Sequence, residues 1–463
     1  MLLVECVSAH RDEREQPTDR LPCSAVSLDL SRLKSQLAAV DPVRVSGTVR
    51  EVVGLSVRAA IPGVRIGELV EIVRRRDPIL RAQVVGFHLD EATLMPLGST
   101  EGVGPDDEVR PLGTGLSILS GDALLGRVLD GLGQPIDGGA PLSELHGLTP
   151  TPVMRLPPNP LTRPRIKKAL PLGVRAIDAL LTVGEGQRVG LFAGSGVGKS
   201  TLLGQIARQA QADVFVVCLI GERGREVVEF LEDALGEEGR KRGVVVCATS
   251  DAPALIRLSS AYVATAIAES FRDRGKRVLL LMDSVTRFAR AGREVGLAAG
   301  EPPARRGYPP SVLAALPGLL ERSGNSPDGS ITALYTVLVE GGDMEEPIAD
   351  EVRGILDGHI VLDRALAIRG RFPAIDPLVS LSRVMDGIAS EAHKDAAKKL
   401  REHVALYEQK RDLVLLGAYK KGSDAKLDAA LAHIDGIEAF LRQGMKEPSR
   451  FDDTLTALHR VTK

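Results

Sequence analysis

The sequence predicts an α/β fold in which a small β-barrel or sandwich comes first, a core with a parallel sheet follows, and a helical domain ends the chain. Three patterns lead to this prediction. Short alternating runs separated by turn residues fill residues 43–112, as in a small barrel or sandwich. From about residue 173, continuous apolar runs alternate with helical segments, as in a parallel sheet that helices cover on both faces. Beyond residue 385 the apolar residues recur at helical spacing.

The bulk composition is that of a soluble globular protein. The 463 residues suffice for two or three domains with their own cores. Hydrophobic residues make up 44% of the chain, and the net charge of −2 gives no overall basic field that would attract nucleic acid. No apolar run approaches the roughly 18 residues that span a bilayer, and residues 1–20 lack the basic start of a secretion signal. We therefore expect a cytoplasmic protein.

The cysteines agree with a reducing compartment. Cys6, Cys23, Cys218 and Cys247 form no CxxC pair, and no His/Cys cluster has the spacing of a zinc site. Free thiols are expected, because disulfides are rare in the cytosol.

The domain boundaries are expected where the pattern changes. Residues 1–42 read as a tail and a short amphipathic helix, on which Leu30, Leu33 and Leu37 form an apolar stripe. Such a helix is too short to be stable alone, so we expect it to serve assembly or docking. The Gly- and Pro-rich stretch after residue 113 predicts a surface connector. The predicted domains are 1–42 (tail and helix), 43–112 (barrel), 113–385 (α/β domain) and 386–463 (helical domain), and the predicted core strands are 188–193, 214–220, 243–248, 277–282 and 331–339.

The motif AGSGVGKS at residues 193–200 lies between an apolar strand and a helical run, which is the setting of a phosphate-binding loop. Its glycines let backbone N–H groups point at phosphate oxygens, Lys199 would reach the β- and γ-phosphates, and the Ser200 hydroxyl would bind Mg²⁺. The motif usually opens with Gly and here opens with Ala193, a compatible small residue. The alternative is a chance Gly-rich turn. The predicted nucleotide-binding residues are Gly194, Ser195, Gly196, Val197, Gly198, Lys199, Ser200 and Thr201.

Two carboxylates stand at the ends of apolar strands. Asp283 ends the run RVLLLMD, where it could hold Mg²⁺ through water. Glu222 follows VFVVCLI within the sequence GER, where it could orient and deprotonate the attacking water. Many parallel strands end in Asp, and a Glu at a helix start is favoured by the helix dipole alone. Because a phosphate loop is also present, a role in ATP hydrolysis is favoured for both residues over a purely structural role.

At these motifs the chain resembles the type III secretion and flagellar export ATPases, which are similar to the catalytic subunits of F- and V-type rotary ATPases. The resemblance runs from about Val43 to Arg442. It implies a RecA-like P-loop core between a β-barrel and a helical domain. The segments that carry it include GLFAGSGVGKSTLL, IGERGREV, MDSVTRFARA, GLAAGEPPARRGYPPSV, ILDGHIVL and FPAIDPLVSLSRVM.

The resemblance also implies roles for single residues. Glu222 would be the catalytic carboxylate, and Arg383 would be a finger inserted into the neighbouring subunit's site. Phe372 would pack on the adenine, and Arg223 would meet the γ-phosphate. The loop with Tyr308 would line the interior of a ring.

Three positions depart from the family's usual pattern. Residues 340–344 read EGGDM where EGDDM is usual, so Gly342 takes the place of an Asp. Gly292 stands where Gln is frequent, and Asp363 stands where Ser is frequent. None is a phosphate or finger position, so the departures concern ring contacts more than hydrolysis. The segments AGSGVGKSTLLG and LLGAYKKGSDAKLDAAL resemble the flagellar branch, whereas TRFARA and GEPPARRGYPPSV occur readily in the virulence branch. The flagellar branch is slightly favoured over the injectisome branch.

The function implied is ATP hydrolysis by a homohexameric ring that energises unfolding, chaperone release and export of proteins. Implied partners are ATP with Mg²⁺, an export-apparatus stalk or regulator, export-gate proteins and substrate–chaperone complexes, at the periphery of the inner membrane and without nucleic acid. One alternative is the catalytic subunit of an ion-translocating rotary ATP synthase, whose ring divides the parts between two chains. The other is a Rho-like translocase, which needs aromatics on its barrel, whereas residues 43–112 contain only Phe87.

Overall fold

The computed structural model describes Lys34 and residues 45–463. The description below concerns residues 45–463. The predicted leucine stripe at Leu30, Leu33 and Leu37 lies outside the described residues, as do Cys6 and Cys23.

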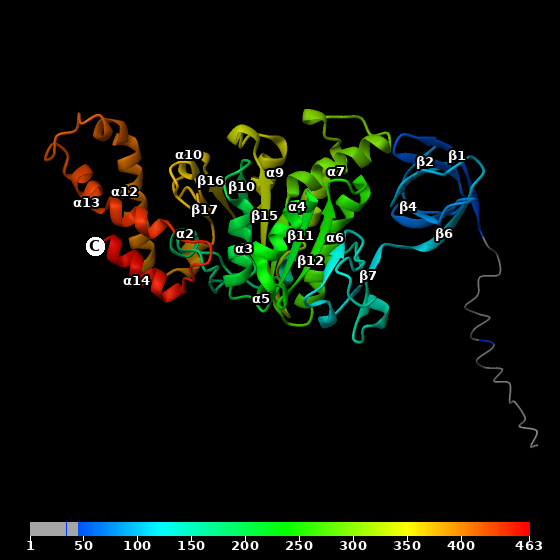
Figure 1. The fold of residues 1–463 in the computed structure, drawn as a ribbon, viewed down its shortest axis with the longest axis horizontal. Coiled ribbons are helices and arrows are strands. Elements are labelled where there is room, and N and C mark those ends of the chain that lie inside the picture. The colour runs from blue at the N-terminus through cyan, green and yellow to red at the C-terminus, as the bar shows by residue number, and fades with distance from the viewer. Residues whose placement is uncertain (1–33, 35–44) are drawn as a thin grey trace, which may run out of the picture. The chain divides into compact units, whose positions relative to one another are not determined.

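Residues 47–115 form a closed six-stranded barrel, which confirms the predicted β domain (Figure 1). The strands follow the order β1-β2-β5-β4-β3-β6, with antiparallel neighbours. Alternate side chains such as those of Val70 and Ile72 fill the interior, because successive residues of a strand face opposite sides. The strands are β1 (Gly47–Val53), β2 (Ser56–Ala60), β3 (Glu68–Val73), β4 (Leu80–His88), β5 (Glu91–Pro96) and β6 (Glu108–Gly115).

The connector after the barrel is more structured than its Gly- and Pro-rich sequence predicts. Strand β7 (Ser117–Ser120) pairs with β9 (Thr149–Pro152), and the short β8 (Val128–Asp130) joins the edge of the core sheet beside β12. The Asp137 carboxylate accepts hydrogen bonds from the Arg127 guanidinium at 2.7 Å and from the Val128 amide at 3.0 Å. These hydrogen bonds of Asp137, here called the Asp137 clamp, hold β8 in place although glycines surround it.

The core is a mostly parallel sheet in the order β17-β16-β10-β15-β13-β11-β12-β8. Only β17 and β14 pair antiparallel in it. The predicted strands are all present, and β8, β14, β16 and β17 complete the sheet. The bounds are β10 (Arg188–Ala193), β11 (Val214–Glu222), β12 (Gly243–Thr249), β13 (Arg277–Asp283), β14 (Gly324–Asn325), β15 (Ser330–Leu338), β16 (Gly358–Leu362) and β17 (Leu381–Ser382).

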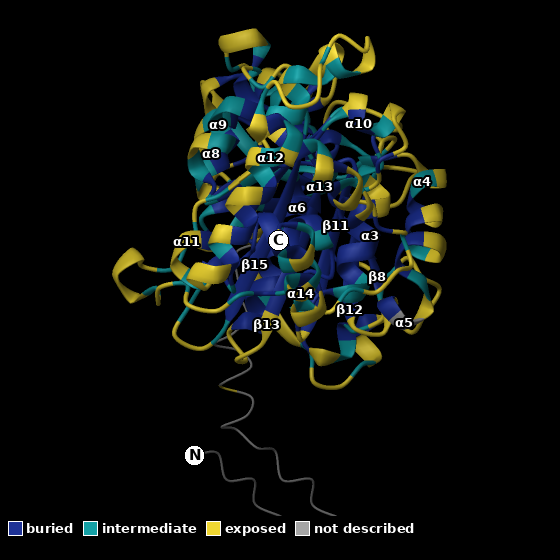
Figure 2. Ribbon diagram, turned by 90° about the vertical axis from the view of Figure 1, so that its left-hand side faces the viewer, coloured by how far each residue is buried: buried dark blue, intermediate teal, exposed yellow. Residues whose placement is uncertain are grey.

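Both faces of this sheet are covered, as the continuous apolar strands predict. In β11, Val217 belongs to one hydrophobic core and its neighbour Cys218 to the other. The first core includes residues of α2 and α3, and the second includes residues of α6, α7, α8 and α9. The strands are accordingly dark blue in Figure 2, whereas yellow, exposed residues lie mostly on loops and outer helix faces.

The helices of the core vary from one turn to five turns. A π-helical turn at Phe230–Leu235 joins α4 to α5 and packs on α3. Short 3₁₀ turns lie at Asp122–Leu124, Leu142–Glu144, Pro160–Thr162, Arg305–Gly307 and Glu340–Gly342. The helices are α2 (Arg175–Leu180), α3 (Lys199–Gln209), α4 (Gly224–Glu229), α5 (Gly236–Arg240), α6 (Ala254–Arg272), α7 (Val285–Ala298), α8 (Pro310–Leu320), α9 (Pro347–Ile355), α10 (Arg364–Ile368) and α11 (Met385–Ile388).

Three helices form the C-terminal part: α12 (Glu391–Leu415), α13 (Ala425–Leu441) and α14 (Phe451–Val461). They pack on α2, and the ring of the buried His393 makes a 2.7 Å hydrogen bond to the Ala179 carbonyl. This confirms the predicted helical domain. Among the described residues, no helix combines the length and the apolar character needed to cross a membrane.

Candidate active site

The phosphate-loop sequence connects β10 to α3, as predicted. Gly196 and Gly198 have φ values of 77° and 88°, a left-handed conformation that favours glycine. Gly198 is the residue immediately before α3. The first amide groups of that helix have no partner within it, and the helix dipole adds positive potential there. The end of α3 that begins with Lys199 is therefore suited to bind phosphate.

The structure brings Lys199 together with both predicted carboxylates. The Lys199 ammonium contacts Oδ1 of Asp283, and it lies 3.6 Å from Oε1 of Glu222. Strands β11 and β13 are parallel neighbours with Leu219 opposite Asp283, so the residues at their ends reach the same edge of the sheet. Both carboxylates are buried, at 6% exposure for Glu222 and 2% for Asp283.

Arg287 completes the charged cluster, although the sequence reasoning did not single it out. Its Nη1 lies 2.6 Å from Oε1 of Glu222. Arg287 lies in the first turn of α7, where its amide donates a hydrogen bond to the capping Ser284 hydroxyl at 3.3 Å. The available signal was the run MDSVTR, which places an arginine one helical turn after the strand that ends in Asp283.

Burial is the main cause that raises the pKa of Glu222 above its ordinary value. A side-chain hydrogen bond with Glu226 raises the pKa further, and the charges of Lys199 and Arg287 oppose the shift. A carboxylate with a raised pKa, close to the place of the terminal phosphate, is suited to general-base chemistry.

The residues around Asp283 are compatible with Mg²⁺. Its Oδ1 accepts a 2.7 Å hydrogen bond from the Thr336 hydroxyl, which fixes the carboxylate. Ser200 lies next to Lys199 at the start of α3. In the described part of the chain there is no group of three or more His, Cys, Asp or Glu residues that could hold a metal. One carboxylate and one hydroxyl beside a phosphate site fit Mg²⁺, which usually takes few protein ligands together with substrate phosphates.

The predicted adenine residue lies beside the phosphate loop. A Cβ placed on Gly198 would be 3.6 Å from the Phe372 ring, and Phe372 is 47% exposed. A half-exposed aromatic face at this distance from the loop is suited to stack on a base.

The two other predicted arginines lie outside the cluster. The Arg223 side chain is 79% exposed and pairs with Glu226 at 3.6 Å. Arg383 follows β17 and is exposed, and its backbone amide donates to the Asp357 carbonyl at 3.0 Å. Within the described residues, no ion pair joins either arginine to Glu222 or Asp283.

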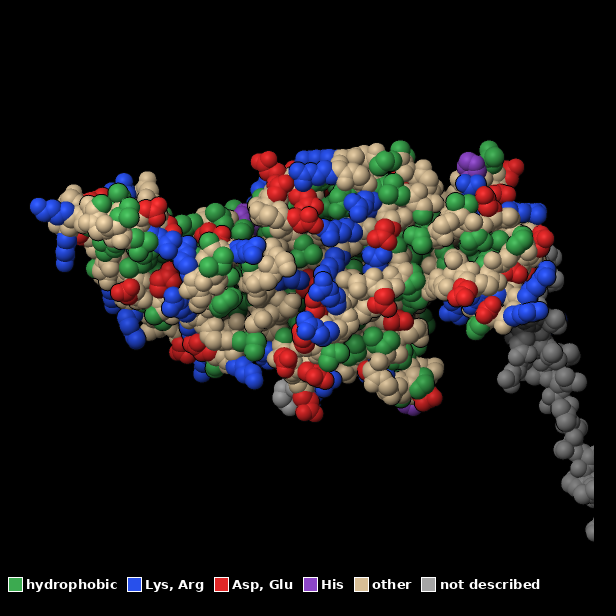
Figure 3. Space-filling model, turned by 45° about the horizontal axis from the view of Figure 1, so that its top comes forward, with side chains coloured by type: hydrophobic (Ala, Val, Ile, Leu, Met, Phe, Trp, Pro, Cys, Tyr) green, Lys and Arg blue, Asp and Glu red, His purple; other side chains and the backbone are tan. Residues whose placement is uncertain are grey.

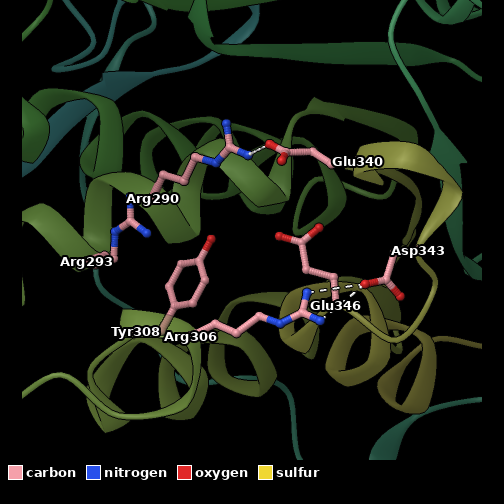
Figure 4. A pocket seen from close by; sticks show the side chains of 7 residues that line it. All are labelled: Arg290, Arg293, Arg306, Tyr308, Glu340, Asp343 and Glu346. Atoms are coloured by element: carbon pink, nitrogen blue, oxygen red, sulfur yellow. Dashed lines mark hydrogen bonds and ion pairs between the residues drawn. The ribbon is translucent and has the colours of Figure 1, made fainter.

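A separate pocket of about 390 Å³ lies where α7, the loop with Tyr308 and the segment after β15 meet (Figure 4). Arg290 pairs with Glu340 at 2.5 Å, Arg306 pairs with Asp343 at 3.2 Å, and the Arg293 guanidinium lies 5.2 Å from the centre of the Tyr308 ring. The lining residues are Arg290, Arg293, Arg306, Tyr308, Glu340, Asp343 and Glu346. None belongs to the phosphate cluster.

Two of the three sequence departures have local explanations. Asp363 caps α10 by accepting a 2.9 Å hydrogen bond from the Leu366 amide, a role that Ser also fills. A Cβ on Gly292 would lie 3.3 Å from Val312, so α7 and α8 approach closely there. The third, Gly342, lies beside the charged pocket and has a φ of 82°.

The surface agrees with the modest net charge. On the face drawn in Figure 3, blue and red side chains are interspersed over the core and do not gather into one basic surface.

Known proteins match all three parts of the chain. Residues 43–113 match the ATP synthase alpha/beta family, beta-barrel domain, and residues 173–382 match the nucleotide-binding domain of that family. Residues 389–460 match the T3SS EscN ATPase C-terminal domain. The nucleotide-binding match includes the phosphate loop, Glu222, Asp283 and Phe372.

Full-length relatives are closely similar. The chain is 52% identical to the flagellum-specific ATP synthase of Bacillus subtilis over 90% of this chain and 95% of the relative. It is 52% identical to the type 3 secretion system ATPase of Xanthomonas euvesicatoria over 93% of this chain and 97% of the relative. The structure of the assembled ATPase EscN from the enteropathogenic E. coli type III secretion system matches with a TM-score of 0.85 at 46% identity, over 90% of this chain and 100% of EscN. EscN in complex with its central stalk EscO matches with a TM-score of 0.84 at 46% identity, with the same coverage.

Proposed function

The chain belongs to the family of type III secretion and flagellar export ATPases, and from this premise we propose that it hydrolyses ATP as a homohexameric ring. As a member of this family it is a P-loop ATPase. The observation that carries the proposal is the cluster of Lys199, Glu222, Asp283 and Arg287 at one edge of the sheet, beside the phosphate loop. All of these groups belong to one chain, which suits a ring of identical subunits.

In the proposed reaction the phosphate loop and Lys199 bind the β- and γ-phosphates of ATP. Ser200 and Asp283 would hold Mg²⁺, which supplies charge neutralisation at the phosphates. Glu222 orients a water molecule and takes its proton while the water oxygen bonds to the γ-phosphorus. The bond between that phosphorus and the bridging oxygen breaks, so ADP and phosphate are released. The Arg287 guanidinium lies where it can contact the oxygens of the transferred group.

We assign the remaining roles as follows. Phe372 stacks on the adenine, and Arg383 enters the site of the neighbouring subunit. Two findings support Arg383 as a finger in trans: it is exposed, and within the described residues it makes no ion pair with the cluster of its own chain. Arg223 is equally free to meet a phosphate after a change of rotamer, because its partner Glu226 holds it only at the surface.

The ring would serve protein export through a type III apparatus, with the flagellar system slightly favoured over the injectisome. A stalk or regulator, export-gate proteins and substrate–chaperone complexes are the proposed partners, at the cytoplasmic periphery of the inner membrane. The structures of EscN as an assembled ATPase and in complex with its central stalk EscO support a ring and a stalk partner. A nucleic-acid translocase is less well supported, since Phe87 is the only aromatic residue within residues 43–112.

The test mixes two inactive variants, Lys199→Ala and Arg383→Ala. Arg383→Ala alone should be nearly inactive, because a finger in trans contributes roughly 10³–10⁵ in turnover. Lys199→Ala alone should be nearly inactive, because it lacks the side chain that binds the β- and γ-phosphates. In mixed rings some interfaces pair an intact phosphate loop with an intact finger, so ATPase activity should partly return. Ring formation is checked by gel filtration with nucleotide. Near-normal turnover of Arg383→Ala alone would refute the role of the finger.

A further inference from the structure

Gln443 lies just after α13 and is hydrogen-bonded to three parts of the chain: residues 173–175, Phe372 and Glu447. It is 5% exposed, and its side-chain amide is fully hydrogen-bonded. Oε1 accepts from the Arg175 amide at 2.8 Å, and Nε2 donates to the carbonyls of Gly173 at 2.8 Å and Glu447 at 3.0 Å. The backbone amide of Gln443 donates to the Phe372 carbonyl at 2.8 Å. The helical domain is thus bonded directly to the residue that carries the adenine-stacking ring.

The chain just before Phe372 is held by the same helical domain. Arg371 is 3% exposed and its Nη1 lies 3.0 Å from Oε1 of Glu438 in α13. Arg369 pairs with Glu408 of α12 at 2.9 Å. Two ion pairs and one backbone hydrogen bond therefore connect the Phe372 segment to the C-terminal helices.

The loop that contains Gln443 is also bonded to the phosphate-binding helix. Arg208 and Gln209, near the end of α3, donate to the carbonyls of Met445 at 2.9 Å and Glu447 at 3.0 Å. Helix α3 begins with Lys199, which contacts Asp283. Residues 443–447 are therefore hydrogen-bonded both to Phe372 and to the last residues of the phosphate-binding helix.

We propose that Gln443 is a positioning residue for nucleotide binding, which sets the distance between the Phe372 ring and the phosphate loop. In this way the helical C-terminal domain controls how tightly the adenine base is held, without touching the phosphates. The inference rests on the proposed stacking role of Phe372. It assigns Gln443 no contact with ATP.

The sharpest variant is Gln443→Glu, which keeps the size of the side chain and one acceptor for the Arg175 amide. It replaces the donor Nε2 with an oxygen that would face the carbonyl oxygens of Gly173 and Glu447. The Gly173 carbonyl loses this donor, the Glu447 carbonyl keeps only the one from Gln209, and both meet a negative charge. The segment should therefore shift and carry the Phe372 backbone with it. The KM for ATP and the inhibition constant of ADP should each rise about tenfold, a factor that corresponds to about 1.4 kcal/mol.

Inorganic tripolyphosphate separates a positioning role from general damage to the site. It occupies the phosphate loop and has no base, so its inhibition constant should stay within about twofold of the wild-type value, and kcat should change little. Gln409→Glu is the matched control, because it makes the same change of amide to carboxylate in the helical domain, at an exposed position of α12. It should leave both inhibition constants unchanged.

Equal weakening of ADP and tripolyphosphate by Gln443→Glu would overturn the inference, and so would no weakening of either. If that variant does not fold, Gln443→Ala, which adds no charge, takes its place. It is judged by the same comparison of the inhibition constants of ADP and tripolyphosphate. Phe372→Ala tests the underlying proposal separately. If Phe372→Ala weakens ADP and Gln443→Glu does not, only the positioning role fails. If Phe372→Ala leaves ADP binding intact, the stacking role itself is wrong.

Discussion

Replacing Glu222 by Gln should remove hydrolysis while nucleotide binding survives. Gln has the same shape and can still accept a hydrogen bond from Arg287, but it cannot take a proton from water. Loss of a general base costs roughly 10²–10⁴ in rate, or about 2.7–5.4 kcal/mol of barrier. We expect kcat to fall by that factor and the affinity for MgATP to change by less than about threefold.

The fold should tolerate this change, because the other charges keep partners. Lys199 still contacts Asp283, and the Arg287 side chain is 26% exposed, so water can solvate it. Thermal unfolding of the variant should therefore remain close to that of the wild type. The measurements are single-turnover hydrolysis, equilibrium binding of MgATP and a melting curve. Hydrolysis within a few-fold of the wild-type rate would show that Glu222 is not the base.

The pH profile gives a second test of the same residue. Glu222 must be ionised to accept a proton, and its pKa is raised, chiefly by burial. Activity should therefore fall as the pH drops through this raised pKa, at a higher pH than an exposed glutamate would titrate. The acidic limb should disappear from the residual activity of Glu222→Gln. An acidic limb that is unchanged in the variant would assign it to another group.

Three further outcomes are expected. Arg287→Ala removes a charge that lowers the pKa of Glu222, so the acidic limb of the pH profile should move to higher pH. Arg290→Ala is the control, because Arg290 lies three residues along α7 and is paired with the exposed Glu340. This variant should leave the acidic limb of the pH profile unchanged. Lys199→Ala should weaken MgATP binding as well as turnover, and unchanged affinity in a binding titration would contradict the assignment. The Arg322 guanidinium lies 2.7 Å from the carboxylate of Glu269, which is 1% exposed and has a second cation, Arg155, at 3.7 Å. Arg322→Met should lower the free energy of unfolding by about 3–5 kcal/mol, because it leaves this buried carboxylate without its close partner. The double variant with Glu269→Leu should recover most of that loss in denaturant titrations, and a purely additive result would show that the ion pair is not coupled.

The order of the chain explains why the centre of the site could be predicted from sequence. Continuous apolar strands indicate a parallel sheet, and the carboxyl ends of parallel strands meet at one edge. Glu222 and Asp283 each end such a strand and the phosphate loop follows one, so their proximity is a consequence of the topology. Arg287 does not end a strand. Its contact with Glu222 depends on the direction in which α7 leaves the sheet, which the local pattern does not contain.

The parts that were missed depend on contacts between distant segments. Strand β8 is three residues long, and its place at the sheet edge depends on the pairing with β12 and on the Asp137 clamp. The residues next to Gln443 in the sequence form no motif that would indicate its role. Its hydrogen bond to Gly173 spans 270 positions, so only the folded chain shows that it holds the Phe372 segment.

The site is divided among three kinds of support, and each should govern a different measurable quantity. Lys199, Glu222 and Asp283 are held by the buried sheet, so changes there should act on phosphate binding or on the chemical step whatever the protein concentration. Phe372 is held by the helical domain through Gln443, so changes there should act on KM through the base. Arg383 is exposed and would complete a neighbour's site, so its contribution should grow with protein concentration as rings form. If Arg383 acts as proposed, a subunit kept apart from others should bind ATP normally and hydrolyse it slowly, and assembly would be the switch for turnover.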